Sequence, residues 1–524
     1  MSELDAERND RELNGREPND REPNDREPND RESNDRESND RESSGREPND
    51  RESSGREPNG RELNVREPKG RELALEARQL DAADELAGLR TRFVLDDAVY
   101  LDGNSLGALP VSVPGRLADV VYREWGELRI RSWDESGWWT APERIGDRIA
   151  PLVGAAPGQI VVGDSTSVNV FKALVAAVRM ADPAGDGRRD EILVDATTFP
   201  TDGYIAESAA RMTGRTLRPV TPAEVPAALS DRTAAVLLNH VDYRTGRLHD
   251  LPGLTAAAHR AGAHIVWDLC HSAGALPVGL DEHGVDLAVG CTYKYLNGGP
   301  GSPAYLYVRH DLQPHFDSPL PGWTSHAQPF AMHPSYEPAT GAPRGRVGTP
   351  DILSMLALEA ALDVWYGGSG GPTEGPGADT ATTAGTGSRT GTGTRTGTGS
   401  GTGTRTGSGT GTGSGTGTGI GVTIESVRAK SLALTDFFLR CVSAYVPEGR
   451  VESLTPTAHA ERGSQIALRC DDAGDVMKRL IHQGVIGDFR HPDVLRFGFT
   501  PLYVSFTDVE HAAWVLGETL GSPG

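Results

Sequence analysis

Residues 1–70 of this 524-residue chain lack almost all apolar side chains. They repeat a five-residue unit, Arg-Glu-Pro-Asn-Asp, with Ser and Gly variants. Such a segment buries too little apolar surface to offset the entropy lost on ordering, so we expect a disordered tail. It has no apolar core like that of a signal peptide. Its acids outnumber its bases, which argues against a nucleic-acid-binding arm; a binding tail or a localisation tag is the functional alternative.

Cysteine, long apolar runs and positive charge are also scarce. The cysteines show no CxxC spacing, which argues against a disulfide framework and favours a reduced cytoplasmic enzyme. No run approaches the roughly eighteen apolar residues of a membrane span. The formal net charge of −22 argues against nucleic acid and anionic membrane as the main partners. The four cysteines are Cys270, Cys291, Cys441 and Cys470.

A second segment of low complexity occupies residues 367–421 and consists of Gly, Thr and Ser with a few Arg. Its composition is that of a flexible linker, which we expect to be disordered. Helical patterns precede it at 352–366 and resume at 422–445. We therefore expect a long surface-loop insertion, because loop-closure entropy grows only logarithmically with length. Without the two low-complexity segments roughly 400 residues remain, enough for a large domain and a smaller one.

Apolar strand patterns, loops and helical patterns alternate between residues 159 and 309. This alternation predicts an α/β fold with a mostly parallel sheet that helices cover on both faces. From residue 462 the pattern predicts a small α+β unit, and a first helix is predicted at 71–90. A further amphipathic helix is predicted at 122–131. The expected strands of the large sheet are residues 160–162, 191–195, 234–238, 263–267 and 285–290.

An acidic and a basic residue follow two of these strands. Asp268 ends the strand at 263–267, and Lys294 precedes a glycine-rich turn after the strand at 285–290. In open α/β sheets the ligand crevice lies beyond the carboxyl ends of the strands. A lysine there can act as a nucleophile toward a carbonyl, and a nearby carboxylate can keep a pyridinium nitrogen protonated, as a pyridoxal phosphate (PLP) enzyme requires. The alternatives are a solvated lysine and a helix-capping aspartate.

Three other stretches carry candidate binding residues. The strand at 160–162 leads into a helix, so Thr166 and Ser167 lie where first-turn N–H groups are unpaired. That junction predicts a phosphate site, or simply a helix cap. Phe199, in a loop after a strand, is placed to stack on a flat cofactor ring. Arg496 lies in an apolar strand pattern and needs a carboxylate, either from a substrate or from a protein acid.

Two features near the start of the foldable region also stand out. Residues 99–107 form a short strand that breaks into a turn at Asn104 and Ser105, where glycines allow close approach of the backbone to another group. Three tryptophans then occur in a polar setting, which predicts a lined pocket, a subunit contact or a seal over the core. They are Trp133, Trp138 and Trp139.

Five motifs, in the right order, closely resemble those of the kynureninase family. The resemblance runs from about residue 95 to about residue 520, with 367–421 as an insertion. It implies a fold-type I, PLP-dependent enzyme of the class V aminotransferase superfamily, with a mostly parallel sheet of the seven-stranded type and a smaller α+β domain. The motifs are Gly-Asp-Ser-Thr-Ser-Val-Asn, Phe-Pro-Thr-Asp, Trp-Asp-Leu-Cys-His, Thr-Tyr-Lys-Tyr-Leu-Asn-Gly-Gly-Pro-Gly and Arg-Phe-Gly-Phe-Thr-Pro-Leu-Tyr. The implied domains are 71–130 (N-terminal segment of the small domain), 131–350 (large PLP-binding domain) and 351–524 (C-terminal small domain).

The resemblance also implies roles for individual residues. Lys294 would bond covalently to PLP, Asp268 would pair with the ring nitrogen, and Phe199 would stack on the ring. Arg496 would bind the α-carboxylate of the substrate, and Tyr293 is our candidate proton donor. The other implied cofactor-binding residues are Thr166, Ser167, Pro200, Thr201, Asp202, Asn239, His271, Tyr293, Trp323 and Thr349. Ser105, Asn104 and Trp133 would contact the substrate, with Ser105 and Trp133 flanking its aromatic group, and Trp323 and Thr349 would act from the partner subunit of a homodimer.

The implied reaction is the hydrolytic cleavage of the Cβ–Cγ bond of L-kynurenine, and of L-3-hydroxykynurenine, in tryptophan catabolism and NAD biosynthesis. The products are anthranilate or 3-hydroxyanthranilate, and L-alanine. The chain has Thr349 where the family often has Asn, and Trp133 where it often has His. Bacterial members that favour kynurenine over its 3-hydroxy form look like this chain.

Other functions remain open at this point. An aminotransferase would use the same scaffold, and so would a cysteine desulfurase, although that enzyme needs an exposed thiolate on a mobile loop and none of the four cysteines fits. A binding protein or scaffold would use the low-complexity segments as its functional parts. A metal site formed by Asp268 and His271 lacks an evident third ligand, so we expect none.

Overall fold

The computed structural model describes residues 68–185, 187–366 and 422–521. The repeats at 1–67 and the Gly/Thr/Ser block at 367–421 lie outside the described residues. The two predictions of disorder concern these segments and are therefore not tested. The described residues belong to one compact unit. The boundaries of the expected large and small domains therefore stay a prediction.

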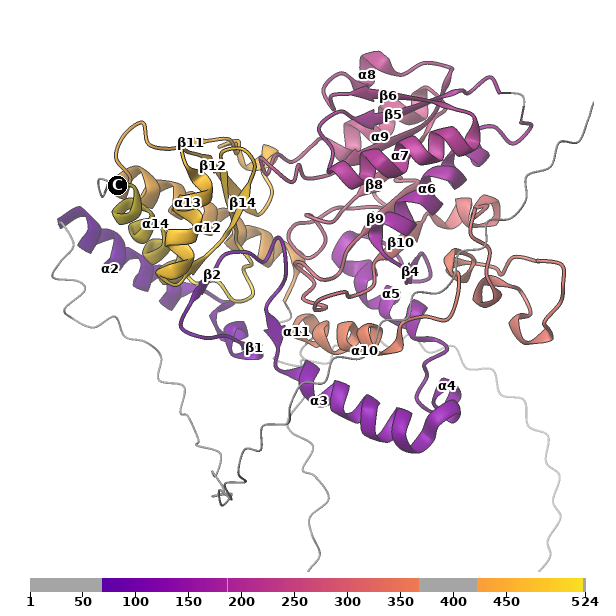
Figure 1. Ribbon diagram of the computed structural model, residues 1–524, viewed down its shortest axis with the longest axis horizontal. Helices are drawn as coiled ribbons and strands as arrows, with labels where there is room; N and C mark the ends of the chain where they lie inside the picture. The colour runs from indigo at the N-terminus through magenta and orange to yellow at the C-terminus, as the bar shows by residue number, and fades with distance from the viewer. Residues whose placement is uncertain (1–67, 186, 367–421, 522–524) are drawn as a thin grey trace, which may run out of the picture. The chain divides into compact units, whose positions relative to one another are not determined.

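A seven-stranded sheet forms the centre of the α/β region (Figure 1). Five of its strands run parallel, from β6 at one edge to β9, and β10 runs antiparallel to both of its neighbours. The prediction of a mostly parallel α/β sheet is confirmed. In sheet order the strands are β4 (Ile160–Val162), β10 (Tyr305–Val308), β9 (Leu287–Gly290), β8 (His264–Asp268), β7 (Thr233–Asn239), β5 (Glu191–Asp195) and β6 (Thr216–Val220).

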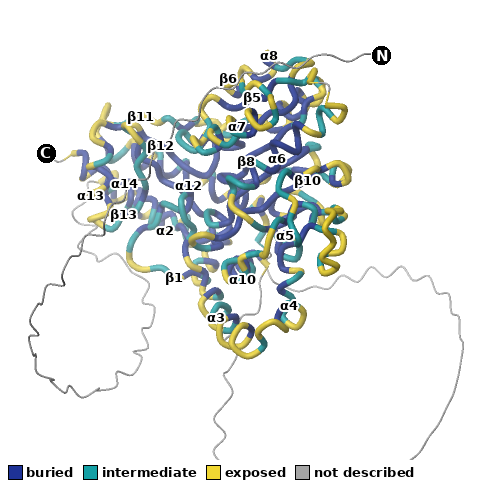
Figure 2. Tube along the Cα trace, turned by 45° about the vertical axis from the view of Figure 1, so that its right-hand side comes forward, coloured by how far each residue is buried: buried dark blue, intermediate teal, exposed yellow. Residues whose placement is uncertain are grey.

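Both faces of this sheet are covered. Helices α6 (Thr166–Ala181) and α7 (Pro200–Thr213) pack on one face of the sheet. Helices α5 (Ala141–Val153) and α9 (Leu251–Arg260) pack on the opposite face. In β8 the side chain of Val266 joins the core beneath α6, whereas Trp267 joins the core on the opposite side. Such strands consist almost entirely of apolar residues because neither face meets water. Figure 2 shows these strands as buried.

Two strands of the sheet, β6 and β10, were not among those predicted. Strand β6 contains Pro219 and is mostly exposed, so it lacks the apolar pattern of its neighbours. Proline removes a backbone donor, which an edge strand tolerates. Strand β10 is apolar and buried, but it is only four residues long and lies directly before an irregular tract. A run so short fits either a strand or a loop.

A second, antiparallel sheet occupies the C-terminal region. Its order is β11-β12-β15-β14, and helices α12 (Ile424–Tyr445) and α14 (Phe506–Gly521) pack together beside it. The N-terminal region joins this part, because α2 (Pro68–Ala83) packs on α14. Strand β2 (Val99–Tyr100) pairs with β13 (Val485–Ile486). The four strands are β11 (Glu452–Ser453), β12 (Gln465–Arg469), β15 (Val494–Gly498) and β14 (Asp488–Arg490), and α13 (Ala473–His482) follows β12.

The first helix is shorter than the sequence predicts. The pattern indicated residues 71–90, but α2 ends at Ala83 and a 3₁₀ turn covers Ala87–Arg92. Asp84 lies at the break, where its carboxylate accepts a hydrogen bond from the N–H of Leu86 at 2.9 Å. An aspartate that bonds to the backbone two residues ahead favours a turn over continued helix.

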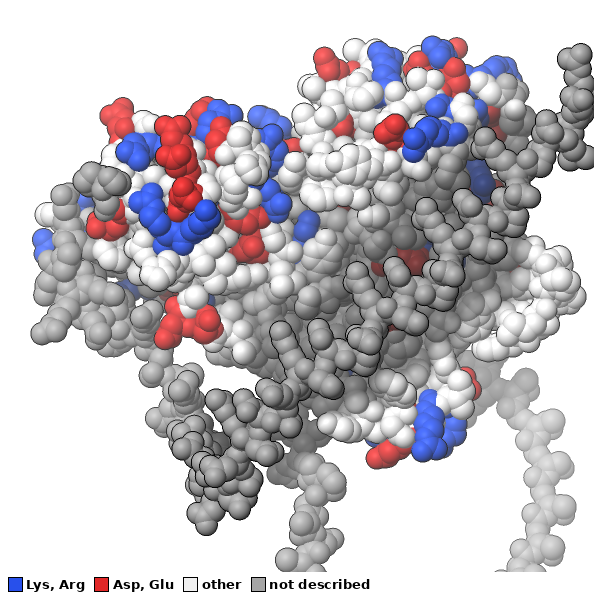
Figure 3. All heavy atoms as spheres, viewed as in Figure 1, with Lys and Arg blue, Asp and Glu red and all other residues white. Residues whose placement is uncertain are grey.

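On the face shown in Figure 3, acidic and basic side chains alternate without a broad area of one sign. Among the described helices, none combines the length and the apolar character needed to span a bilayer.

Candidate active site

The carboxyl ends of β7 and β8 bring two carboxyl groups and an amide together. Asn239 and Asp268 are register partners in the sheet. The side-chain amide of Asn239 donates to Oδ2 of Asp268 at 2.8 Å and to Oδ2 of Asp202 at 3.1 Å. Burial, together with the charge of Asp268, raises the pKa of Asp202 well above its usual range. A proton held on Asp202 removes the repulsion that two charged carboxyl groups would have in this buried place.

Lys294, in the turn after β9, contacts a buried histidine. Its Nζ lies 2.9 Å from Nε2 of His271, whose Nδ1 lies 3.0 Å from Oε1 of Gln465. Burial and the charge of Lys294 lower the pKa of His271 well below its usual range, so the ring is neutral. Nδ1–H then donates to Gln465, and Nε2 accepts from Lys294. The charge of Lys294 also acts on the pKa of Asp202, in the lowering direction, so the amine lies within electrostatic range of the carboxyl pair.

The N-terminus of α6 opens on a cavity of about 490 Å³. Ser165 caps the helix, and its hydroxyl accepts a hydrogen bond from the N–H three residues later at 3.4 Å. Thr166 and Ser167 form the first turn and line the cavity together with Tyr293 and Thr349. The unpaired N–H groups and the dipole of a helix N-terminus attract anions. This end of the site can therefore hold a phosphate.

Phe199 lies immediately before α7 and is 41% exposed. Its ring meets that of Tyr243 edge to face, with 5.2 Å between the centroids. Pro200 and Thr201 open α7, so that Asp202 lies in the first turn, next to Asp268. This exposed aromatic ring, three residues before Asp202, is available to stack on a planar ligand.

Trp133 and Trp323 belong to one aromatic cluster. The ring of Trp133 lies 5.9 Å from that of Trp138 and 6.2 Å from that of Trp139. Trp139 in turn lies 5.5 Å from Trp323. Within the described part of the chain, no hydrogen bond or ring contact connects this cluster with Lys294. The structure thus groups these two predicted residues with each other and shows no direct contact between them and the lysine in the described part of the chain.

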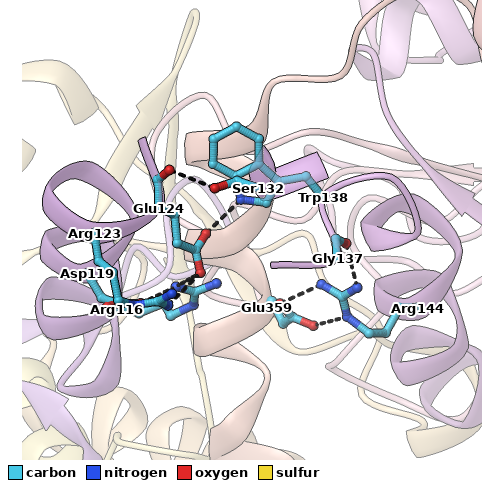
Figure 4. Close-up of polar contacts among 9 residues, drawn as sticks. All are labelled: Arg116, Asp119, Arg123, Glu124, Ser132, Gly137, Trp138, Arg144 and Glu359. Atoms are coloured by element: carbon cyan, nitrogen blue, oxygen red, sulfur yellow. Dashed lines mark hydrogen bonds and ion pairs between the residues drawn. The ribbon is translucent and has the colours of Figure 1, made fainter. Parts of the chain in front are cut away.

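Glu124 fixes the segment that carries this cluster (Figure 4). It lies in a π-helical stretch, Val120–Leu128, which covers most of the amphipathic helix predicted at 122–131. Its buried carboxylate accepts hydrogen bonds from Nε1 of Trp138 at 2.6 Å and from Arg116 at 2.9 Å, and its carbonyl accepts one from the hydroxyl of Ser132 at 2.6 Å. π-Helical turns are frequent at functional sites. This network sets the position of the tryptophans.

Arg496 is buried in β15, where its side chain is 1% exposed. The guanidinium pairs with the carboxylate of Asp488 on β14 and donates to the hydroxyl of Ser105 at 3.0 Å and to the carbonyl of Tyr243 at 2.6 Å. Of the two partners that the sequence left open, the structure shows the protein acid. Whether Arg496 also binds a substrate carboxylate stays a prediction.

Gln465 and Asp488 are site residues that the sequence reasoning missed. Gln465, buried at the start of β12, presents Oε1 to His271 at 3.0 Å and to the amide of Asn104 at 3.3 Å. Its own amide donates to the carbonyl of Tyr243 at 2.9 Å. A polar residue at the start of an apolar strand was the available indication, because buried polar groups need partners.

The remaining groups near the lysine are thiols and a phenol. The N–H of Cys291 donates to the sulfur of Cys270 at 3.2 Å, and all four cysteines are buried. Burial argues against the exposed nucleophile of a cysteine desulfurase. The neighbouring Cys291 and burial raise the pKa of the Tyr293 phenol, which therefore keeps its proton. Across the described ranges, no group of three or more His, Cys, Asp or Glu residues is arranged to hold a metal ion.

Solved structures with this fold include PLP enzymes. A structure of C-DES with glycine covalently linked to the PLP cofactor has a TM-score of 0.63 at 18% identity and covers 82% of this chain and 99% of that one. A cysteine desulfurase from Escherichia coli has a TM-score of 0.62 at 17% identity, covering 83% of this chain and 98% of that one. At these identities the likeness establishes the fold alone.

Sequence comparisons are more specific. Residues 100–369 match the family model for class-V aminotransferases, and residues 427–516 match that for the kynureninase C-terminal domain. A kynureninase from Pseudomonas fluorescens is 43% identical over 445 residues, which cover 84% of this chain and 94% of the relative. One from Deinococcus radiodurans is 44% identical over 440 residues, covering 83% and 93%. The chain belongs to the kynureninase family of class-V, PLP-dependent enzymes.

Proposed function

We propose that the protein hydrolyses the Cβ–Cγ bond of L-kynurenine to give anthranilate and L-alanine, and that it acts in the same way on L-3-hydroxykynurenine. Kinship with kynureninases at 43% and 44% identity over most of the chain supports this function. The observation that carries the proposal is the placement of one amine, Lys294, in the same site as the buried Asp268–Asp202 pair.

The residues at this site fit PLP. Lys294 offers the amine for the cofactor aldehyde, and the buried carboxylate of Asp268 suits a protonated ring nitrogen, since opposite charges stabilise each other strongly away from water. Thr166 and Ser167 offer the first-turn N–H groups and hydroxyls for the phosphate. Phe199 supplies an exposed ring for the face of the pyridine. When bound, PLP withdraws electrons from the carbon atoms of the attached amino acid.

The chain's own groups then handle the protons. The amine of Lys294 takes up the proton that leaves the α-carbon of the substrate, and the neutral ring of His271 accepts a hydrogen bond from the resulting ammonium. The carboxylate of Asp268 retains the proton on the ring nitrogen. The phenol of Tyr293, which its surroundings keep protonated, is the proton donor during cleavage.

We assign recognition of the substrate to the residues around Arg496. We assign the α-carboxylate to Arg496, because a guanidinium binds carboxylates through two parallel hydrogen bonds. Asn104 is linked through Gln465 to His271, which joins the substrate end to the lysine. Trp133 is assigned to the aromatic group of kynurenine.

We further propose that the protein is a cytoplasmic homodimer with shared active sites. Thr349 lines the cavity at the proposed phosphate end, and Trp323 lies beside Phe330, which is 70% exposed. Large exposed apolar side chains of this kind mark contact surfaces. Trp323 would act in the site of the partner subunit, whereas the cavity lining favours a place for Thr349 in the site of its own subunit. Four unpaired cysteine thiols fit a reducing compartment.

The test is turnover of L-kynurenine by the PLP-loaded protein, followed by the fluorescence of anthranilate. Lys294→Ala should abolish both turnover and the visible absorbance of the cofactor bound through that amine. Lys478→Ala, on an exposed side chain of α13, serves as the matched control and should change neither. Wild-type activity that persists in Lys294→Ala would contradict the proposal, and amino-group exchange with a keto acid would indicate an aminotransferase instead.

A further inference from the structure

The pair of Arg496 and Asp488 has a specific geometry. The two residues lie directly opposite each other on β15 and β14. Nε of Arg496 donates to Oδ1 of Asp488 at 2.9 Å, and Nη2 donates to Oδ2. A guanidinium has a side edge, Nε–Nη2, and an end edge, Nη1–Nη2, either of which can bind a carboxylate bidentately. Asp488 therefore occupies the side edge and leaves the end edge to other acceptors.

Two weaker acceptors lie on the end edge. Nη1 donates to the carbonyl of Tyr243 at 2.6 Å, and Nη2 donates its second hydrogen to the hydroxyl of Ser105 at 3.0 Å. The Ser105 hydroxyl donates to Oδ2 of Asp488 at 2.9 Å. Arg496 has five N–H groups, and four of them have partners among the described residues. A carboxylate that binds the end edge must therefore displace the Ser105 hydroxyl from Nη2 and share Nη1 with the Tyr243 carbonyl, which can use the other hydrogen of that atom.

The charges around Arg496 also favour a fixed orientation. Arg490 contacts Oδ2 of Asp488 at 2.8 Å, so Asp488 lies between two guanidinium groups. Asp488 is 16% exposed and Arg496 1% exposed at their side chains. Removing one partner of a buried ion pair leaves the other charge uncompensated. Asp488 both balances Arg496 and prevents its rotation away from the end-on direction.

The geometry points to Asp488 as a positioning residue, which presents the end edge of Arg496 to the α-carboxylate of the substrate. In the absence of substrate, the Ser105 hydroxyl occupies the position of one carboxylate oxygen. This inference rests on the proposed function, in which Arg496 binds the α-carboxylate. It assigns Ser105 to the carboxylate end of the substrate rather than to its aromatic end.

Steady-state kinetics with L-kynurenine test the inference. Asp488→Ala should raise KM roughly 30-fold or more, because the buried guanidinium loses its partner. Turnover at saturation should change by less than about threefold, and the visible absorbance of bound PLP should stay unchanged, since Asp488 does not touch the reacting atoms. Asp488→Glu, which keeps the charge, should recover part of the loss. Asp488→Asn keeps the shape of the side chain and carries the test if the alanine variant does not fold.

The matched control is Glu452→Gln. Glu452 and Arg469 are also register partners across the same sheet and form an ion pair of 2.8 Å, but the two side chains are 66% and 47% exposed. This variant should leave KM and kcat within about twofold of the wild type, as expected for a surface pair. A loss of kcat without a rise in KM in Asp488→Ala would overturn the inference, as would equal losses in the Glu and Ala variants.

Inhibition by L-alanine and by L-alaninamide separates this inference from the proposed function. The wild type should bind alanine better than the amide, and Asp488→Asn should lose at least about tenfold of that preference. If the wild type turns over kynurenine but does not prefer the carboxylate, the positioning role is wrong while the proposed function stands. If no anthranilate forms at all, the proposed function is wrong and the inference goes with it.

Discussion

The two ends of the site are built on different sheets and by different physical means. The proposed cofactor end, comprising Asp268, Lys294 and His271, lies at the carboxyl ends of parallel strands, where loops converge. The proposed carboxylate end, comprising Arg496 and Asp488, lies within antiparallel strands, where side chains face each other in register. At the strand ends, residues from several loops are gathered around one place, whereas a cross-strand pair orients one charge rigidly. The difference predicts that substitutions at the cofactor end lower kcat and that substitutions at the carboxylate end raise KM.

The largest effect is expected from Asp268→Asn. The amide loses the charge that holds a proton on the ring nitrogen, so kcat should fall roughly 100-fold or more with little change in KM. Steady-state kinetics with L-kynurenine and the visible spectrum of the bound cofactor check this prediction. An increase in KM at constant kcat would break the comparison between the two ends.

Arg496→Lys should give the second-largest effect, and this effect should be on KM. A lysine keeps the charge but cannot offer two parallel hydrogen bonds, so KM for L-kynurenine should rise roughly 10- to 100-fold. Turnover at saturating substrate should stay within about threefold of the wild type. Equal falls in kcat and in kcat/KM would show that Arg496 acts mainly in the transition state, contrary to this account.

Asp102 is a second carboxyl group at the carboxylate end. Its ionisation should affect the stability of the fold, by less than the preceding substitutions affect the kinetics. Burial, reinforced by Asp488, raises the pKa of Asp102 from 3.8 to about 6. The folded protein therefore binds this proton more tightly than the unfolded chain does. The ionised carboxylate destabilises the fold above about pH 6, and this penalty fades as the pH falls toward 4.

Asp102→Asn should remove that penalty. After allowance for partial exposure, the variant should be about 1–2 kcal/mol more stable than the wild type at pH 8, and the gain should shrink by pH 4.5. Urea unfolding at the two pH values checks the prediction. A gain that is the same at both would mean that the effect is not electrostatic.

Glu452→Gln should have the smallest effect on stability as well as on kinetics. Its pair with Arg469 is exposed, so the free energy of unfolding should change by less than about 1 kcal/mol. A loss as large as that of Asp488→Ala would show that burial does not separate the two cross-strand pairs of this sheet.

Much of the cofactor end could be predicted from sequence because its residues follow strands directly. Strands β7, β8 and β9 lie in apolar runs; Asn239 and Asp268 end the first two, and Lys294 lies in the turn after the third. The direction of parallel strands then places these residues at one edge. Strand β6 is mostly exposed and lacks that pattern, and the apolar run of β10 leads directly into an irregular tract, so both were missed.

The carboxylate end could be predicted only in part. The need of Arg496 for an acid followed from its apolar surroundings, but the identity of the acid depends on strand register, which a single sequence does not reveal. Gln465 bonds to His271 across 194 residues, a contact that no local pattern encodes. The π-helical stretch around Glu124 likewise depends on the partners Arg116 and Trp138.

Borohydride reduction of the PLP-loaded protein, followed by peptide mass mapping, tests the central claim most directly, because reduction fixes the cofactor on the amine that holds it. The structure offers a genuine competitor, since Lys172 is buried in the wall of the cavity at the start of α6, where it pairs with Asp164 at 2.6 Å. The account predicts the cofactor on Lys294, with none on the other lysines. Labelling of Lys172, or of any lysine other than Lys294, would contradict it.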